Sequence, residues 1–108
     1  MDKAVEEIDF KKEGGLIPVI VQDVNTKDIL MLAYANKEAL ELTVKSGKAW
    51  FWSRSRNKLW MKGEESGNFQ KVKKVMVDCD SDALVYLVEP AGPACHTGNR
   101  TCFHNELK

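Results

Sequence analysis

Two segments near the C-terminal end of the chain contain the residue types that most often bind metal ions. Segment 78–82 places aspartates at alternate positions, with a cysteine and a serine between them. Segment 92–102 contains the other two cysteines and one of the two histidines. Thiolates are soft ligands that select zinc-like metals, whereas carboxylates are hard ligands that suit magnesium or calcium. The two segments together predict that the chain binds two different metals.

The cysteines of these segments are Cys79, Cys95 and Cys102. Three thiolates leave one tetrahedral position of a zinc ion open for water, as in a catalytic zinc site. The spacing alone also fits a structural zinc with His96 or His104 as the fourth ligand. Because the chain has no C-x-x-C pair, buried thiols without any metal are a further alternative.

The aspartates of the first segment are Asp78, Asp80 and Asp82. On an extended strand their period of two would put all three on one face, with Cys79 on the opposite face. Carboxylates this close repel one another unless a cation holds them or water screens them. The pattern therefore fits a site for a hard cation, and a solvated acidic turn is the alternative.

His96 adjoins a candidate metal ligand. A free imidazole titrates near neutral pH, so this side chain can act as general base on a metal-activated water. The alternative is a surface histidine in a loop. His104, two residues beyond Cys102, is the weaker candidate.

A third group of candidate residues combines cations with tryptophans in the middle of the chain. Arginine binds phosphate oxygens in a bidentate manner, and tryptophan can stack on a heterocyclic base. The residues concerned are Arg54, Arg56, Trp60 and Lys62. The alternative is a strand with solvated cations and core tryptophans. For Trp50 and Trp52 we expect the core.

The hydrophobic pattern predicts the elements that must position these residues. Residues 1–15 form a polar lead-in, from which Phe10 is expected to pack on the core. A turn at 25–28 joins the first two strands into a hairpin. Runs rich in Val, Ile and aromatic residues predict strands at 16–24, 29–34, 49–54, 59–62, 72–77 and 83–89. Proline and glycine make 92–102 a loop.

One helix is expected near residues 36–47. Asn36 is a suitable N-cap, and Gly47 is a suitable stop. Leu40, Thr43 and Val44 are expected to share the buried face. The fold class is therefore α+β and predominantly β, with mostly antiparallel strands and one main helix.

The 108 residues form a single expected domain, 1–108, with sixteen basic and sixteen acidic side chains. Such a balance gives no overall field that attracts nucleic acid or an acidic membrane surface. The longest apolar runs are too short to span a bilayer, and the N-terminus lacks the features of a signal peptide. Three cysteines cannot all pair within one chain. We therefore expect a cytoplasmic protein with reduced thiols and with neither nucleic-acid nor membrane partners.

Nearly the whole chain, residues 16–103, resembles the phosphoribosyl-AMP cyclohydrolases of histidine biosynthesis. The motifs that carry this resemblance lie at 52–56, 59–60, 62–68, 70, 72, 78–82, 92–98 and 101–103. They are long and they occur in the same order. The departures are small: Ala35 stands where the family often has methionine, and Thr101 where it often has serine.

The resemblance implies a zinc- and magnesium-dependent hydrolase that forms an intertwined homodimer. It implies one zinc per subunit, held by Cys79, Cys95 and Cys102, with Cys79 contributed across the dimer interface. Asp78, Asp80 and Asp82 would bind magnesium, and His96 is the candidate base. The resemblance also implies that the substrate-binding residues are Arg54, Arg56, Trp60, Lys62, Glu64, Ser66 and Gln70. Some relatives carry a fused pyrophosphohydrolase domain. This chain stops at Lys108, so we expect the monofunctional form.

The implied reaction opens the adenine ring of 1-(5-phosphoribosyl)-AMP at the N1–C6 bond. Ribose on N1 puts positive charge on the purine and makes C6 electrophilic toward a zinc-activated water. The two phosphates of the substrate account for magnesium and for cations such as Arg54 in an otherwise neutral chain.

Two other functions are alternatives to this one. A zinc-stabilised module that binds nucleotides or RNA would have a closed four-ligand zinc and no turnover. A zinc nucleobase deaminase would need H-x-E and P-C-x-x-C motifs. The chain lacks both motifs, and Pro93-Ala94-Cys95 is the nearest approach.

Overall fold

The computed structural model describes residues 4–11 and 14–108. Its elements are η1 (Val5–Glu7), β1 (Ile17–Asp23), β2 (Ile29–Ala35), α1 (Lys37–Ser46), β3 (Trp50–Ser53), β4 (Lys58–Met61), β5 (Gln70–Val77) and β6 (Leu84–Pro90). The predicted α+β class, with mostly strands and one main helix, is confirmed. Residues 1–3 and 12–13 of the predicted lead-in lie outside the described residues. Among the described helices, none is long and apolar enough to cross a membrane.

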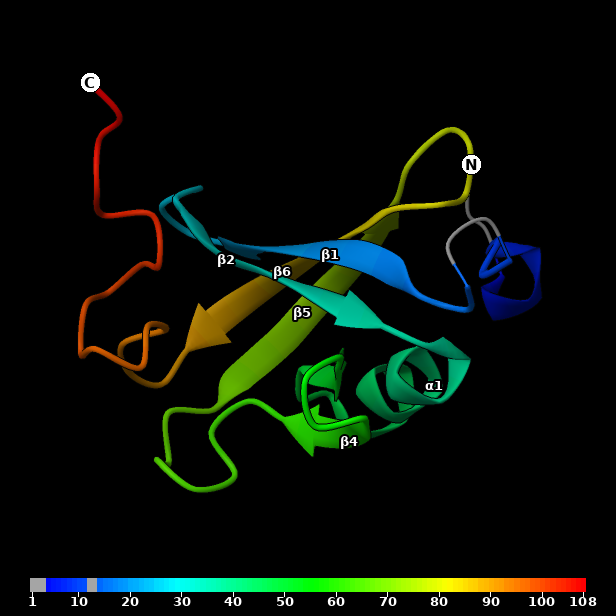
Figure 1. Cartoon of the computed structure of the whole chain (residues 1–108), viewed down its shortest axis with the longest axis horizontal. Helices are drawn as coiled ribbons and strands as arrows, with labels where there is room; N and C mark the ends of the chain where they lie inside the picture. The colour runs from blue at the N-terminus through cyan, green and yellow to red at the C-terminus, as the bar shows by residue number, and fades with distance from the viewer. Residues whose placement is uncertain (1–3, 12–13) are drawn as a thin grey trace.

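Four strands form the main sheet in the order β2-β1-β6-β5 (Figure 1). β1 pairs antiparallel with β2, as the predicted hairpin requires, and β5 pairs antiparallel with β6. β1 also pairs with β6 in parallel, a long-range pairing that the sequence pattern did not predict. β3 and β4 form a separate antiparallel hairpin.

The predicted caps of α1 are confirmed. The Asn36 side chain accepts a hydrogen bond from the Ala39 amide at 2.8 Å, and Gly47 ends the helix with a left-handed φ of 76°. Leu40 and Thr43 are buried, but Val44 is 58% exposed, so its predicted burial is wrong. The buried arc is centred on Ala39, Leu40 and Thr43, and Val44 lies about 90° away from that centre.

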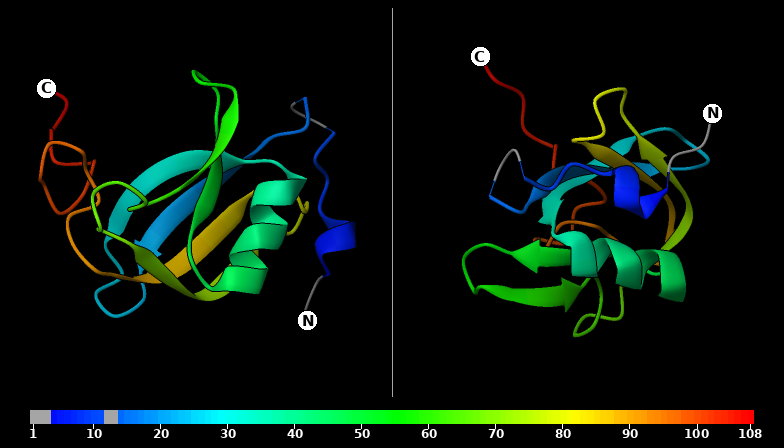
Figure 2. Two further views of the ribbon diagram at one scale, coloured as in Figure 1. Left: turned by 90° about the horizontal axis from the view of Figure 1, so that it is seen from below. Right: turned by 90° about the vertical axis from the view of Figure 1, so that its right-hand side faces the viewer.

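α1 and the β3–β4 hairpin lie on the same side of the main sheet (Figures 1 and 2). The core forms between them, from alternate residues of the central strands such as Val19, Val21 and Tyr86. Phe51 of β3 is fully buried there, and its ring lies 5.7 Å from that of Tyr86. Phe10 packs against this core, as predicted.

The opposite face of the sheet carries an apolar row that follows the strand register. Leu32 pairs with Ile20, Ile20 with Val85, and Val85 with Met76, so the row crosses all four strands. Leu32 and Met76 are each 48% exposed, and Ile20 is 39% exposed. We call these four residues the outer row.

Candidate functional site

Segment 92–102 is a loop, as predicted, and hydrogen bonds of its own backbone close it. The amides of Ala94 and Cys95 donate to the carbonyls of Arg100 and Asn99, each at 3.1 Å. The Cys102 amide donates to Leu30 of β2 at 2.7 Å, which attaches the end of the loop to the sheet. This folding brings Cys95 and Cys102 together, with Cys95 buried and Cys102 exposed.

The two thiols have different acidities. The Thr97 hydroxyl, with Oγ1 3.0 Å from Cys95 Sγ, and then the Thr97 backbone amide stabilise the Cys95 thiolate and lower its pKa to about 6, although burial opposes them. Burial raises the pKa of Cys102, and the negative charge of the Cys95 thiolate adds to that effect. The positive charge of Lys62 acts in the other direction. The contacts with Thr97 therefore favour the thiolate form of Cys95.

Cys79 lies at the far end of the molecule from this thiol pair. It belongs to the turn between β5 and β6, whereas segment 92–102 follows the opposite end of the same hairpin (Figure 1). A strand rises about 3.3 Å per residue, so the hairpin separates the two places by roughly 20 Å. Within the described residues no three His, Cys, Asp or Glu side chains are gathered around a point where a metal could bind.

The acidic segment is a turn, which is one of the two arrangements that the sequence left open, and its aspartates do not lie on an extended strand. β5 ends at Val77, and Asp78 Oδ1 then accepts the backbone amides of Asp82 and Ala83 at 2.9 and 3.2 Å. A short acceptor side chain that binds nearby amides favours a turn over a strand. The hydrogen bond from Cys79 Sγ to Asp80 Oδ1 (3.3 Å), followed by the charge of Asp80, raises the pKa of Cys79.

Most of the predicted substrate-binding residues line two neighbouring surface hollows. The smaller, of about 190 Å³, is lined by Arg56, Trp60, Met61, Lys62, Gly63, Glu64, Glu65 and Ser66. The larger, of about 620 Å³, lies over β2 and β3 and includes Trp60 again, together with Arg54 and Trp52. We call them the small and the large hollow. Because Trp60 lines both hollows, Arg54 of the large hollow and Arg56 and Lys62 of the small hollow belong to one continuous surface.

The core placement predicted for Trp50 and Trp52 is confirmed for Trp50 only. Trp50 is partly buried against the core, with its indole Nε1 buried and unpaired among the described residues. Trp52 lines the large hollow. Phe51, between them, points into the core, because alternate residues of a strand face opposite sides. The Arg54 guanidinium lies 3.9 Å from the centre of the Tyr34 ring.

Gln70 is not placed with the other predicted substrate residues. Its side chain is fully buried, its Nε2 donates to Met31 Sδ at 3.7 Å, and its Oε1 has no hydrogen-bond partner among the described residues. Substrate binding by Gln70 stays a prediction, and its observed surroundings are those of the core.

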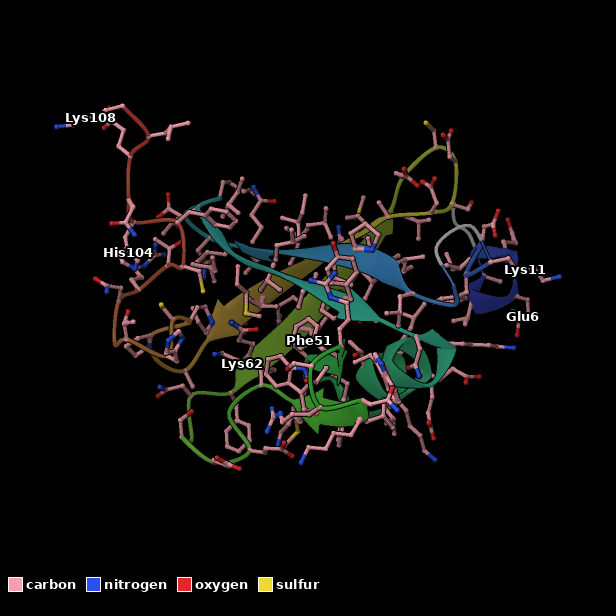
Figure 3. The ribbon with its side chains drawn as sticks, viewed as in Figure 1. Glu6, Lys11, Phe51, Lys62, His104 and Lys108 are labelled. Atoms are coloured by element: carbon pink, nitrogen blue, oxygen red, sulfur yellow. The ribbon has the colours of Figure 1, made fainter. Side chains whose placement is uncertain are left out.

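The structure adds a histidine to the surroundings of the thiol pair. His96 is exposed in the loop next to Cys95. His104 Nε2 lies 4.0 Å from Cys95 Sγ, although the sequence made His104 the weaker candidate. Figure 3 shows His104 and Lys62 on the side of the molecule opposite to Glu6 and Lys11. No sequence motif marked this position beyond its closeness to Cys102.

Two glycines hold the wall of the small hollow close to segment 92–102, which we call the thiol loop. Gly63 has a φ of +91°, and a Cβ there would lie 2.5 Å from the Phe69 amide nitrogen. A Cβ on Gly92 would collide with the Asn68 side chain. The Ala91 amide donates to the Phe69 carbonyl at 2.7 Å. These contacts bring Gly63 and Gly92 to the same segment, 68–69.

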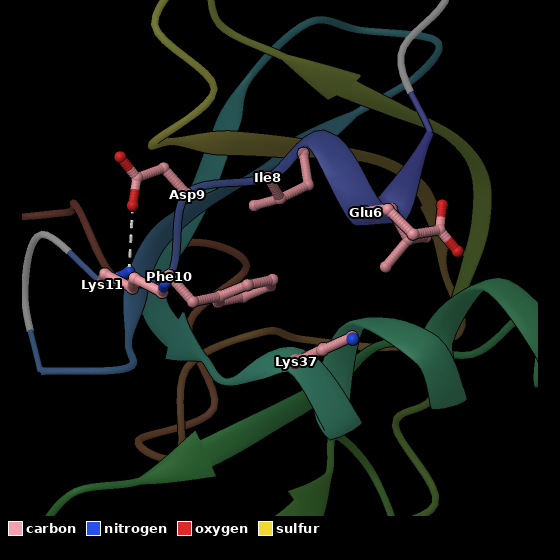
Figure 4. Close-up of a pocket in the computed structure, with 7 residues that line it drawn as sticks. Glu6, Ile8, Asp9, Phe10, Lys11 and Lys37 are labelled. Carbon is pink, nitrogen blue, oxygen red and sulfur yellow. Dashed lines mark hydrogen bonds between the residues drawn. The ribbon is translucent and has the colours of Figure 1, made fainter.

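A further hollow of about 410 Å³ lies between the N-terminal segment and α1 (Figure 4). Its lining includes Glu6, Ile8, Phe10 and Lys37. It contains none of the cysteines, histidines or arginines discussed above, so it is separate from the candidate site.

The fold and the site define a small α+β protein with a thiol pair beside a cationic, aromatic surface. Residues 31–104 match the family model described as phosphoribosyl-AMP cyclohydrolase. The chain is 71% identical to the phosphoribosyl-AMP cyclohydrolase of Nitrosopumilus maritimus over 108 residues, all of both chains. It is 69% identical to that of Cenarchaeum symbiosum over 99% of each chain, and 65% identical to that of Archaeoglobus fulgidus over 89% of each chain. The chain belongs to the phosphoribosyl-AMP cyclohydrolase family.

Proposed function

We propose that this protein hydrolyses the N1–C6 bond of the adenine ring of 1-(5-phosphoribosyl)-AMP in histidine biosynthesis. The observation that carries the proposal is identity of 71% with a relative of that name along the whole chain. The geometry supports it, because the thiol pair lies near enough to the small hollow for Lys62 to influence Cys102.

The chemistry of the donor set fits zinc. Cys95 and Cys102 lie together, and cysteine thiolates are the soft ligands that zinc takes in proteins. The Thr97 hydroxyl, 3.0 Å from Cys95 Sγ, favours the thiolate form of Cys95. When bound, zinc would supply the Lewis acidity that makes water a nucleophile at C6. Cys95 and Cys102 would hold it from one subunit, and Cys79 of a second subunit would supply the third thiolate. One zinc per subunit follows from this arrangement.

The other residues would bind the substrate and move a proton. Arg56 and Lys62 line the small hollow, where they would bind phosphate oxygens by charge-assisted hydrogen bonds. Trp60 would stack on the purine. His96 would accept the proton of the attacking water, and its place beside Cys95 in the sequence keeps it at the loop. Magnesium, which would neutralise the phosphates, would be held by Asp78, Asp80 and Asp82.

The outer row supports a homodimer. It is an apolar surface on the sheet face opposite to α1 and the β3–β4 hairpin. Burying apolar area against a second copy is favourable by about 25 cal/mol for each Å² removed from water. A homodimer would also overcome the distance between Cys79 and the thiol pair, because the β5–β6 turn of a partner subunit could reach the loop.

The experiment that tests the function is an ultraviolet absorbance assay with phosphoribosyl-AMP as substrate. We expect turnover in the purified protein, loss of turnover with a zinc chelator, and recovery when zinc is added back. Arg56→Ala should weaken substrate binding by about 1.5–3 kcal/mol for a lost charge-assisted hydrogen bond. The matched control is Lys73→Ala, which removes an exposed cation paired with Glu89 at 3.2 Å on β5 and β6.

Binding of the substrate without turnover, in protein that contains zinc, would contradict the proposal. It would support a binding module instead. Full activity of metal-free protein would leave the hydrolase assignment standing and refute the role of zinc.

A further inference from the structure

Arg100 is the one cation inside the thiol loop, and it makes an unusual number of contacts for an exposed residue. Its Nη2 donates to Asp23 Oδ2 at 2.8 Å and to Thr26 Oγ1 at 3.0 Å. Its Nη1 donates to Asp28 Oδ2 at 2.6 Å. All three acceptors belong to the end of β1 and the turn that follows. The fork of the guanidinium therefore joins two loops that are more than 70 residues apart in the sequence.

The groups that accept from Arg100 are held in place by hydrogen bonds of their own. The Asp23 side chain is only 8% exposed, and its Oδ1 accepts the amides of Asn25 and Thr26 at 2.8 and 3.1 Å. Hydrogen bonds from the Thr26 amide, then from the Asn25 amide, together with the charge of Arg100, lower the pKa of Asp23 against the effect of burial. The Asp23 amide also donates to the Asp28 carbonyl at 2.9 Å. The turn thus presents fixed acceptors.

The loop side of the contact leads directly to the thiol pair. The Arg100 carbonyl accepts the Ala94 amide, next to Cys95. Thr101 Oγ1 donates to the Ile29 carbonyl at 2.7 Å, and the Cys102 amide donates to the Leu30 carbonyl. Arg100 therefore fixes the backbone just before each cysteine. Its carbonyl holds Ala94, one residue before Cys95, and Arg100 itself lies two residues before Cys102.

We propose that Arg100, held by Asp23, Asp28 and Thr26, is a positioning residue that sets Cys95 and Cys102 at the separation needed to bind zinc together. The inference rests on the proposed function, since zinc is the metal that function requires. An ordinary exposed ion pair contributes little to the stability of a fold, because water and salt screen its charges. This one differs in using a fork of three hydrogen bonds, one of them to a buried carboxylate. Residues that orient metal ligands typically change metal affinity about 10–100-fold when removed.

The test compares the full-length Arg100→Ala variant with wild type and with the Lys73→Ala control. The zinc Kd is measured with zinc ion alone, by competition with a chromophoric chelator. Cobalt(II) then replaces zinc, so that the intensity of its visible bands reports whether the thiolates hold a tetrahedral ion. Melting of metal-free protein in excess chelator gives the stability of the fold by itself.

For Arg100→Ala we expect a zinc Kd about 10–100-fold higher than that of wild type, and weaker cobalt bands at equal cobalt. Arg100→Lys keeps the charge but not the fork, so we expect it to recover only part of the affinity. A purely structural role predicts something else: metal-free protein that melts earlier, with a wild-type zinc Kd for the folded fraction. That result, or an unchanged Kd in folded Arg100→Ala, overturns the proposal.

A second variant keeps the test decisive if Arg100→Ala does not fold. The Asp28 side chain is 57% exposed, so Asp28→Asn removes one charged acceptor with little risk to the core. We expect a several-fold rise in zinc Kd, and an unchanged Kd overturns the proposal. Wild-type protein that binds zinc but does not turn over phosphoribosyl-AMP would refute the proposed function alone. Wild-type protein that turns over phosphoribosyl-AMP but binds no zinc would overturn the role of Arg100 and leave the hydrolase function standing.

Discussion

Mixing two inactive variants tests whether the zinc site is shared between subunits. Cys79→Ala removes the proposed ligand in the β5–β6 turn, and Cys95→Ala removes a proposed ligand in the loop at the other end of that hairpin. Each variant alone should lack activity, because each of its sites has lost a thiolate. In a heterodimer of the two, one site collects both defects and the other collects none.

The expected recovery follows from this geometry. The hairpin separates Cys79 from the thiol pair of its own chain by roughly 20 Å, whereas thiolates on one zinc lie about 2.3 Å from the metal. No single chain can close that gap without unfolding the hairpin. Random reassociation gives about half heterodimers with one intact site of two, so activity should approach roughly a quarter of wild type.

The assay is absorbance-monitored turnover after dissociation and reassociation, with heterodimer formation verified by differently tagged subunits. The matched control mixes Cys95→Ala with Cys102→Ala. In the proposed arrangement those two ligands come from the same chain, so neither site of the heterodimer would be complete and no activity should return. A verified Cys79→Ala and Cys95→Ala heterodimer without activity would refute the shared site. Equal recovery in the control would show that reassociation restores activity by another route.

Three further outcomes are expected. Leu32→Lys should weaken the proposed dimer about 10–150-fold, because burying the exposed half of a leucine is worth about 0.7–1.5 kcal/mol in each of the two subunits. The control Val44→Lys on α1 should leave dimerisation unchanged, and light scattering as a function of protein concentration measures both variants. Asp80→Asn should leave zinc content nearly intact while raising the magnesium needed for activity, and loss of zinc would refute separate metal sites. Thr97→Val should move the pKa of Cys95 up from about 6 toward its ordinary value, because the hydroxyl stabilises the thiolate. The pH midpoint of alkylation in metal-free protein measures that shift. An unchanged midpoint would mean that the backbone amide of Thr97, and not its hydroxyl, lowers the pKa of Cys95.

Local signals predicted most of the fold. The caps at Asn36 and Gly47 depend on residues within one helical turn, so the sequence shows them directly. The parallel pairing of β1 with β6 joins segments about 65 residues apart, which no window of the sequence reveals. Alternation alone did not decide between a strand and a turn at 78–82. The Asp78 carboxylate, which accepts two backbone amides, selects the turn.

The candidate site was likewise predicted from the sequence only in part. Five of the predicted substrate-binding residues line one hollow because they lie within eleven positions of one another, on β4 and the turns beside it. Arg100 was not singled out from the sequence, because its acceptors at Asp23 and Asp28 lie in a distant turn. Gln70 lay inside a recognisable motif, but the register of β5 with β6 directs its side chain inward. Motifs predict which residues matter, whereas the direction of a side chain depends on the assembled sheet.

The three cysteines lie at two ends of the molecule because of the strand topology, and this placement does not depend on the exact register of the strands or on the loop conformations. Cys79 follows β5, the thiol pair follows β6, and antiparallel pairing of those strands forces their following segments to opposite ends. A slip of register by one or two residues would change the distance by about 3–7 Å and leave the separation in place. A zinc site that uses all three thiolates therefore requires a second chain, whatever the conformation of either loop. The outer row gives that second chain a surface to bind, since it crosses the same strands whose ends carry the cysteines. Metal binding and dimerisation should consequently strengthen each other, and zinc should lower the concentration at which dimers form.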